Sequence, residues 1–141
     1  SLYFLKHKIK KNFLLIDADV ITNLNYQNFV KFHKINKSLI TIAVSSYENN
    51  IPFGVIHSKD GKLKDFKEKP IFKYYVNAGV YSVEPHVLKY FKKPQNLSMP
   101  ELFMKENIKK KTIIYPIHEG WTDLGTKKNL IKVKKLMKKN K

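Results

Sequence analysis

Hydrophobic residues along the chain fall into short runs with strand-like or helix-like spacing. An apolar run that ends in acids predicts a buried strand over residues 12–17. Residues 26–35 carry apolar side chains at helical spacing, with Asn25 as a candidate N-cap. A β-rich segment predicts the next strand over residues 38–44. The front of the chain therefore has the order strand, helix, strand.

Turn residues predict a hairpin in the middle of the chain. Residues 54–58 and 62–68 flank Lys59-Asp60-Gly61, and an Asp-Gly pair between two strand-like runs is a strong hairpin signal. Residues 75–83 are predicted to form a further strand. The chain thus returns to extended structure after the hairpin.

The last part of the chain is predicted to be mainly helical. Pro85 opens a short helix through Phe91, and a second helix is expected over residues 100–110. A strand over residues 112–117 precedes a basic amphipathic helix over residues 126–139. The side chains expected to face inward from the two longer helices are Leu102, Phe103, Ile108, Leu130, Ile131, Val133, Leu136 and Met137.

This order of elements predicts an α/β fold in one unit of 141 residues, since no repeat or linker divides the chain. Strand–helix–strand alternation implies a parallel sheet with a crossover, and the hairpin makes the sheet mixed. We therefore expect a Rossmann-like, mixed but mostly parallel sheet, in which the strand over residues 12–17 has neighbours on both edges. Ligands gather at the carboxyl ends of such strands, so Asp17 and Asp19 are well placed for chemistry.

The net charge of +17 would suit a nucleic-acid-binding protein. All 28 basic residues are lysines, however, and arginine, whose planar fork reads guanine and clamps phosphates, is absent. The wealth of Asn, Ile, Phe and Tyr is what an AT-rich coding sequence would produce. The charge therefore indicates weak attraction to any polyanion and no specific nucleic-acid partner.

Several other classes lack support in the sequence. No apolar run approaches the roughly 18 residues of a membrane span, so no membrane partner is expected. Residues 1–11 do not read as a signal peptide, which favours the cytoplasm. The chain has no cysteine, and its five histidines form no zinc motif. No Gly-x-Ser-x-Gly motif supports an esterase.

Two charged motifs carry side chains able to do chemistry. In Asp17-Ala18-Asp19, two carboxylates at a strand end can reach one hard divalent cation such as Mg²⁺, which also bridges substrate phosphates. The structural alternative is that Asp19 only caps the following turn. In Glu68-Lys69-Pro70, the lysine can donate to a phosphate and the acid can accept from hydroxyls. The alternative there is a charged strand end.

Three glycine-containing motifs have similar alternatives. Gly79 in Asn77-Ala78-Gly79 interrupts a strand, which marks close approach of a ligand or backbone, or simple packing. Gly54 in Pro52-Phe53-Gly54 is a comparable case at a strand entrance. Residues 121–126 place Asp123 in a predicted loop and Thr126 as a helix cap, or they form a purely structural turn.

The order of these motifs is more informative than any one of them. Read in register, they resemble the sugar nucleotidyltransferases, or NDP-sugar pyrophosphorylases, from about Asn12 to Val133. The matching segments are Phe-Leu-Leu-Ile-Asp-Ala-Asp, Pro-Phe-Gly-Val, Glu-Lys-Pro, Asn-Ala-Gly-Val-Tyr and Trp-Thr-Asp-Leu-Gly-Thr. Residues 98–103 and 115–119 look especially like the guanylyltransferase-type members.

The resemblance implies roles for particular residues. Asp19 and Asp123 match the family's two magnesium ligands, and Lys69 matches the lysine that holds the sugar phosphate. Glu68 matches an acid that binds sugar hydroxyls. Gly54 and Asn77 fall where the family contacts the sugar.

Two departures from the family pattern stand out. Asp17-Ala18 replaces the family's Asn-Gly before the metal acid, so side chains stand where its glycine has none. The Gly-rich loop Gly-Gly-x-Gly-Thr-Arg-Leu that holds the triphosphate in the family is absent. The resemblance therefore implies a nucleotide-diphospho-sugar transferase fold that is N-terminally incomplete, with residues 1–141 as the C-terminal two-thirds of a nucleotidyltransferase domain.

The implied reaction joins an NTP and a sugar-1-phosphate into an NDP-sugar and pyrophosphate, with Mg²⁺ as cofactor. The rivals are a glycosyltransferase that uses Asp17-Ala18-Asp19 to bind a nucleotide sugar through Mn²⁺ or Mg²⁺, and a non-catalytic basic binding module. Without the Gly-rich loop we expect residues 1–141 alone to be inactive. We also expect an exposed strand edge, which a homo-oligomer would cover.

Overall fold

The computed structural model describes residues 2–92, 97–126, 129–131 and 133. Its elements, in chain order, are the 3₁₀ helix η1 (Leu2–Leu5), β1 (Phe13–Ile16), β2 (Val20–Thr22), α1 (Tyr26–Ile35), β3 (Ile40–Asn50), β4 (Val55–Lys59), β5 (Lys62–Lys67), β6 (Ile71–Val83), the 3₁₀ helix η2 (Pro85–Tyr90), α2 (Met99–Phe103), α3 (Glu106–Lys109), β7 (Thr112–Ile117) and β8 (Trp121–Asp123). None of the helices formed by these residues combines the length and apolar composition that crossing a membrane requires.

The main sheet has four strands in the order β1-β6-β3-β7. Strand β6 is antiparallel to both β1 and β3, and only β3 and β7 pair in parallel. The predicted mostly parallel sheet is therefore wrong, although the α/β class is right. The chain leaves the sheet along β3 and returns to it along β6, so β6 pairs with β3. The strand–helix–strand order at the start of the chain had predicted β1 as that neighbour.

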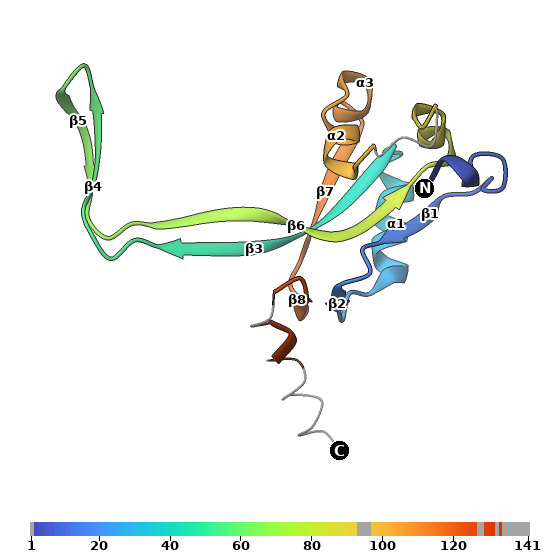
Figure 1. The fold of residues 1–141 in the computed structure, drawn as a ribbon, viewed down its shortest axis with the longest axis horizontal. Coiled ribbons are helices and arrows are strands. Elements are labelled where there is room, and N and C mark those ends of the chain that lie inside the picture. The colour runs from blue at the N-terminus through green and yellow to red at the C-terminus, as the bar shows by residue number, and fades with distance from the viewer. Residues whose placement is uncertain (1, 93–96, 127–128, 132, 134–141) are drawn as a thin grey trace.

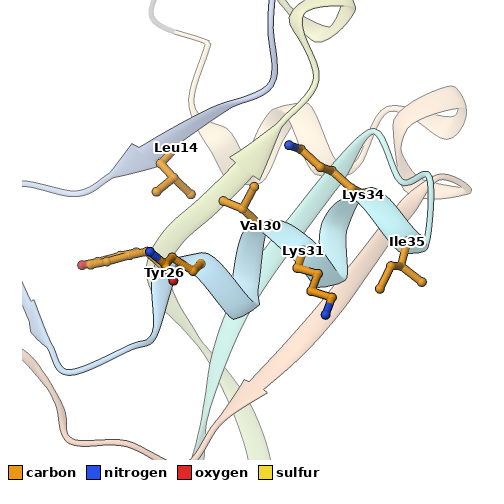
Figure 2. Close-up of a pocket in the computed structure, with 7 residues that line it drawn as sticks. Leu14, Tyr26, Val30, Lys31, Lys34 and Ile35 are labelled. Atoms are coloured by element: carbon orange, nitrogen blue, oxygen red, sulfur yellow. The ribbon is translucent and has the colours of Figure 1, made fainter.

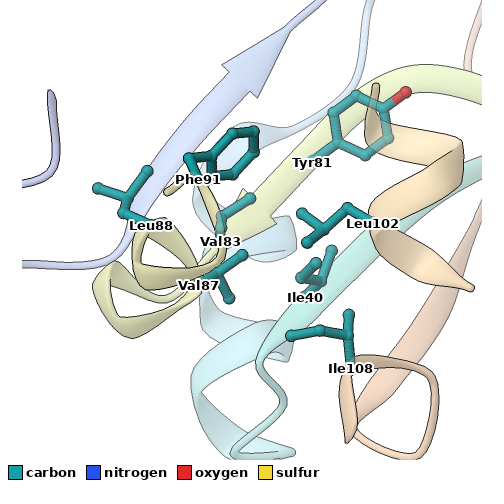
Figure 3. Packing of buried hydrophobic residues seen from close by; sticks show 8 residues of the cluster. All are labelled: Ile40, Tyr81, Val83, Val87, Leu88, Phe91, Leu102 and Ile108. Carbon is teal, nitrogen blue, oxygen red and sulfur yellow. The ribbon is translucent and has the colours of Figure 1, made fainter. Parts of the chain in front are cut away.

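Helices cover both faces of this sheet. On one face, α1 packs Phe29 against β3, β6 and β7, with Ala43, Ala78 and Ile117 in the same buried cluster. On the other face, η2, α2 and α3 cover the sheet, as Figure 3 shows. The labelled side chains of that second cluster are Ile40, Tyr81, Val83, Val87, Leu88, Phe91, Leu102 and Ile108.

Several predicted elements form with their expected bounds. Helix α1 spans Tyr26–Ile35, and the Asn25 side chain accepts a hydrogen bond from the Asn28 backbone N–H at 3.0 Å, which confirms the N-cap. The hairpin turn is also confirmed. Asp60 and Gly61 both have positive φ angles, 52° and 74°, as a two-residue type I′ turn requires.

The predicted helix over residues 100–110 is instead two short helices, α2 and α3, and Lys105 between them is extended. Leu102 and Ile108 are both fully buried, and Phe103 is half-buried against Tyr81. Six residues apart on one straight helix, Leu102 and Ile108 would point about 120° away from each other. The break lets both side chains enter the same core.

The end of the chain is described only in part. Residues 129–131 and 133 are helical, and Thr126 Oγ1 accepts from the Asn129 N–H at 3.2 Å, as predicted for the cap. The rest of the helix predicted over residues 126–139 lies largely outside the described residues, and so do Leu136 and Met137. Asp123 ends the short strand β8, which pairs with β2; the predicted loop is wrong.

Strands β3 and β6 are longer than predicted, and their outer halves leave the sheet. Figure 1 shows them as a two-stranded ribbon that ends in the β4–β5 hairpin, far from α1 and β8. We call residues 46–75, from the Ser46–Tyr75 pair outward, the arm. No side chain of the arm is buried.

Candidate active site

The β2–β8 pair brings two distant acids together. Val20 lies opposite Asp123 in the antiparallel register, so Asp19 comes beside the end of β8. The Leu124 N–H donates to the Asp19 carbonyl oxygen at 2.7 Å and fixes this approach in the backbone. Residues about a hundred positions apart in the sequence are thereby neighbours.

The carboxylates of Asp19 and Asp123 both lie close to Gly125. A methyl group at Gly125 would lie 2.9 Å from Asp123 Oδ1 and 3.5 Å from Asp19 Oδ2, and the Gly125 N–H donates to Asp123 Oδ1. Among the described residues, no group of three or more His, Asp or Glu side chains is arranged to hold a metal ion. Two carboxylates completed by waters and phosphate oxygens are a typical Mg²⁺ environment, so the donor set fits that ion.

Asp17 lies at the same end of the sheet, directly after β1. The Tyr81 hydroxyl donates to Asp17 Oδ2 at 3.4 Å and accepts from Asn77 Nδ2 at 2.7 Å. Partial burial raises the pKa of the Asp17 carboxyl, and the negative charges of Asp19 and Asp123 add to the rise, whereas the Tyr81 hydrogen bond opposes it. The negative charges of the three aspartates therefore act together and favour the binding of a cation.

Position 79, where the aspartates meet the sheet, requires a glycine. Its φ of 68° disfavours any side chain, and a methyl group would lie 2.7 Å from Val20 Cγ2 and 2.8 Å from Asp17 Oδ2. The β3–β6 register shifts here, so that residues 78–80 lie opposite Ala43 alone. The structure therefore supports the packing alternative for this glycine, because the atoms that approach it are side chains of Val20 and Asp17 and not a ligand or another backbone.

Trp121 has a structural role. Its indole Nε1–H donates to the Ala78 carbonyl oxygen at 2.8 Å, and its ring packs on the α1 side of the sheet. It therefore ties β8 to β6 and holds Asp123 in position.

The other predicted site residues lie on the arm. Gly54 sits against the ring of Phe66, and a methyl group there would lie 3.1 Å from Glu68 Oε2. Lys69 follows with a φ of 43°, and both Glu68 and Lys69 are exposed. The structure thus brings Gly54 and Glu68 together.

The arm residues and the aspartates are separate in this structure. Strand β6 runs from Ile71, just after Lys69, to Gly79, which touches Asp17. Eight residues of strand span about 25 Å. The structure therefore groups Asp17, Asp19 and Asp123 with Asn77, and does not bring Lys69 to them.

Sequence reasoning missed Tyr81 and the β2–β8 pairing. Tyr81 is four residues after Asn77 in one strand, so the period of two places both on one face and could have suggested the contact. Strands of three residues, such as β2 and β8, leave no periodic signal.

A separate groove lies away from the aspartates. It has a volume of about 570 Å³ and lies between β1 and α1; Leu14, Tyr26, Val30 and Ile35 line it with two lysines (Figure 2). It contains no carboxylate and none of the predicted site residues. Strand β1 pairs only with β6 among the described residues, so the expected second neighbour of β1 is not there.

By fold and site, then, the chain is an α/β protein with aspartates gathered at one end of its sheet. It belongs to the nucleotidyl transferase family, whose model matches residues 2–140. The resemblance drawn from the motifs is thereby confirmed.

Curated relatives with several nucleotide and sugar specificities match the chain. It is 29% identical over 125 residues to a probable mannose-1-phosphate guanylyltransferase of Arabidopsis thaliana, covering 84% of this chain and 37% of that protein. It is 28% identical over 127 residues to a probable glucose-1-phosphate cytidylyltransferase of Bacillus subtilis, covering 89% and 49%. With a glucose-1-phosphate adenylyltransferase of Clostridium kluyveri, 32% identity extends over 130 residues, 83% of this chain and 34% of that protein. The chain thus spans between a third and a half of these relatives.

Solved structures share the fold. A putative glucose-1-phosphate thymidylyltransferase from Bacillus anthracis, crystallised with sucrose, superposes with a TM-score of 0.69 at 20% identity, covering 96% of this chain and 58% of that chain. HddC from Yersinia pseudotuberculosis superposes with a TM-score of 0.64 at 15% identity, covering 96% and 60%.

Proposed function

We propose that this chain carries part of the active site of a sugar-1-phosphate nucleotidyltransferase. The observation that supports the proposal best is the placement of Asp19 and Asp123 around one point beside Gly125. Family membership independently favours the same chemistry. The substrates are then an NTP and a sugar-1-phosphate, and the products are an NDP-sugar and pyrophosphate.

The chemistry needs no catalytic histidine or serine. An oxygen of the sugar phosphate attacks the α-phosphorus of the NTP, a new P–O bond forms, and the bond to the β-phosphate breaks to release pyrophosphate. A phosphate monoester has a second pKa of about 6, so the nucleophile is already ionised at neutral pH. The protein's part is to position the two phosphates in line and to lower their mutual repulsion.

Asp19 and Asp123 are the residues we assign to Mg²⁺. When bound, the cation would supply charge neutralisation at the phosphates. The Tyr81 hydroxyl, which accepts from Asn77, donates to Asp17 and holds this acid beside Asp19 and Asp123. Trp121 keeps β8 on the sheet and thereby positions Asp123.

The family's sugar-phosphate contacts would come from Gly54, Glu68 and Lys69, with Asn77 next to the sugar. In this proposal Lys69 donates to the phosphate and Glu68 accepts from sugar hydroxyls. Because the first three lie on the arm, about 25 Å along β6 from the aspartates, they contact the same substrate only if the arm bends toward β2 and β8.

The pairing across β2 and β8 favours this proposal over an Asp-x-Asp glycosyltransferase. In that rival, Asp17 and Asp19 would share the cation and Asp123 would have no part. Here Asp17 is engaged by Tyr81, and Asp19 shares the space at Gly125 with Asp123.

The test is pyrophosphate release from a panel of NTPs and hexose-1-phosphates. The chain of residues 1–141 is assayed beside a version that carries the upstream coding sequence of its gene. We expect activity only in the longer protein, and a loss of at least a hundredfold in Asp19→Asn and in Asp123→Asn. The control is Asp65→Asn, an exposed acid on the arm.

No pyrophosphate release from the longer protein with any substrate pair would refute the proposed function. Activity in Asp123→Asn equal to that of Asp65→Asn would remove Asp123 from the site. Activity of residues 1–141 at the rate of the longer protein would refute the expectation that a catalytic segment is missing.

A further inference from the structure

A cleft lined by lysines lies at the end of the sheet that is farther from the aspartates. Its volume is about 360 Å³, within the usual range for small-molecule sites of roughly 300–1,000 Å³. Helix η2 contributes His86, Lys89 and Tyr90 to its lining, and α3 with the residues after it contributes Asn107, Lys110 and Lys111. None of these residues has a role in the proposed function.

The strand order gathers lysines at this end of the sheet. Strands β1 and β3 both begin opposite Val83, and β7 begins opposite Ile40, so three strands start at one edge. Lys11, Lys37 and Lys111 lie within three residues before these strands. Figure 1 shows α3 at this end and β2 and β8 at the other. The two ends of the sheet therefore carry opposite charge.

Two of the lysines that line the cleft have no acidic partner. In the described part of the chain, no carboxylate lies within ion-pair distance of Lys89 or Lys111. Lys110 differs, because its Nζ lies 3.2 Å from Glu106 Oε1. The charges of Lys89 and Lys111 are therefore available to a ligand.

The one acid whose backbone joins the wall of the cleft directs its carboxylate elsewhere. The Glu84 N–H donates to the carbonyl oxygen of Leu39, which lines the cleft. Glu84 Oε1, however, lies 3.2 Å from Nε2 of His33, on the helix that covers the other face of the sheet. The Glu84 carboxylate is therefore engaged by His33.

The lining offers the contacts that a chain of phosphates needs. Lysine ammonium groups bind phosphate as point charges, and the side chains of His86 and Asn107 can donate further hydrogen bonds. Tyr90 and Leu39 add apolar surface, and Lys89 Nζ lies 5.5 Å from the centroid of the Tyr90 ring. Several cations match a di- or triphosphate better than a single phosphate, whose charge is about −1.5 to −2.

We propose that this cleft is a second anion site, which binds the di- or triphosphate group of a nucleotide or of an inorganic polyphosphate through Lys89 and Lys111. The site goes beyond the proposed function and does not depend on it. A chain of net charge +17 attracts any polyanion weakly, so the specific claim is that these two lysines bind phosphates more tightly than equally exposed lysines elsewhere.

The experiment compares two double variants that remove the same charge. Lys89→Gln with Lys111→Gln changes the cleft, and Lys62→Gln with Lys64→Gln changes exposed lysines of the arm. Titration calorimetry of the 141-residue chain in EDTA uses inorganic triphosphate, ATP, adenosine and inorganic phosphate as probes, and thermal melting checks that the variants fold. We expect one triphosphate per wild-type chain, binding at least tenfold weaker in the cleft variant, or about 1.4 kcal/mol, and within about twofold of wild type in the arm variant.

The probes also distinguish the two sources of the phosphate group. Tighter binding of ATP than of inorganic triphosphate would assign the cleft to a nucleotide, and equal affinities would assign it to the phosphate chain alone. Both results support the site if the cleft variant loses the binding.

Three results would overturn the proposal. Equal weakening in the two double variants would reduce the binding to general charge. A wild-type chain that binds none of the phosphates would leave the cleft without its ligand class. Binding to phosphatidylglycerol vesicles without binding to any soluble probe would assign the lysines to a membrane surface. Each of these results leaves the assignment of Asp19 and Asp123 unchanged.

Discussion

Strands β3 and β6 pair over most of their length, yet their two ends have different surroundings. From Ile40 to Val44 and from Ala78 to Val83, helices cover the strands on both faces and most side chains are buried. In the arm the same two strands continue without a covering layer. Strand pairing and exposed side-chain contacts such as Lys73–Glu48 therefore hold the arm, whereas buried packing holds the sheet end that carries the aspartates.

This difference has a consequence for function. A site for phosphate transfer needs groups held in place by packed neighbours, and Asp17, Asp19 and Asp123 meet that condition through Gly79, Trp121 and the β2–β8 pair. A two-stranded ribbon is marginally stable alone and its side chains can be repositioned. The arm therefore suits substrate contact rather than catalysis.

The largest contrast in stability is expected between one phenylalanine of each region. Phe29 on α1 is 0% exposed and Phe53 on the arm is 72% exposed. Phe29→Ala should lower the free energy of unfolding by about 3–5 kcal/mol, since a buried ring leaves a cavity. Phe53→Ala should change it by less than about 0.5 kcal/mol. Urea unfolding measures both, and similar losses would show that the arm is packed in solution.

Two glycines with positive φ angles make a finer comparison. Gly79, at the site, has both a φ of 68° and side chains within 2.8 Å of the missing methyl group, whereas Gly61, in the hairpin turn, has a φ of 74° and open space. Gly79→Ala should cost about 2–4 kcal/mol, through backbone strain and overpacking together. Gly61→Ala should cost about 1 kcal/mol through strain alone. Equal losses, measured by urea unfolding, would mean that Asp17 and Val20 move aside freely.

These contrasts also indicate how much the sequence could predict. Local signals, such as Asn25 before α1 and Asp60-Gly61 in the hairpin, depend on neighbours in the chain, and both predictions were right. The strand direction of β6 depends on which partner it meets, and that is decided by packing between distant segments. The family resemblance paired Asp19 with Asp123, but the strands that bring the two acids together, β2 and β8, are too short for a local pattern to predict.

A buried histidine on the packed side gives a smaller, pH-dependent effect. His33 Nδ1 lies 2.8 Å from Thr41 Oγ1 and 3.0 Å from Ser38 Oγ, and Nε2 lies 3.2 Å from Glu84 Oε1. Burial lowers the pKa of His33 below 6.5, and Glu84 opposes the shift only in part. The neutral ring is therefore favoured in the folded state.

The sign of the pH effect follows from this direction. A histidine with a lowered folded-state pKa contributes stability that is fully present above pH 6.5 and is lost as the pH falls through the folded-state pKa. Urea unfolding on either side of that window should show a steeper loss for the wild type than for His33→Gln, which does not titrate. Parallel pH profiles for the two proteins would contradict the shift.

At the packed end of the molecule, Asp19 and Asp123 are proposed to share one divalent cation. Mn²⁺ can stand in for Mg²⁺, and electron paramagnetic resonance counts free Mn²⁺ directly during a titration of the chain. We predict one site that weakens at least tenfold in both Asp19→Asn and Asp123→Asn and is unchanged in the arm variant Asp65→Asn, a difference of about 1.4 kcal/mol or more. Equal Mn²⁺ binding in all four proteins would show that Asp19 and Asp123 do not share a cation.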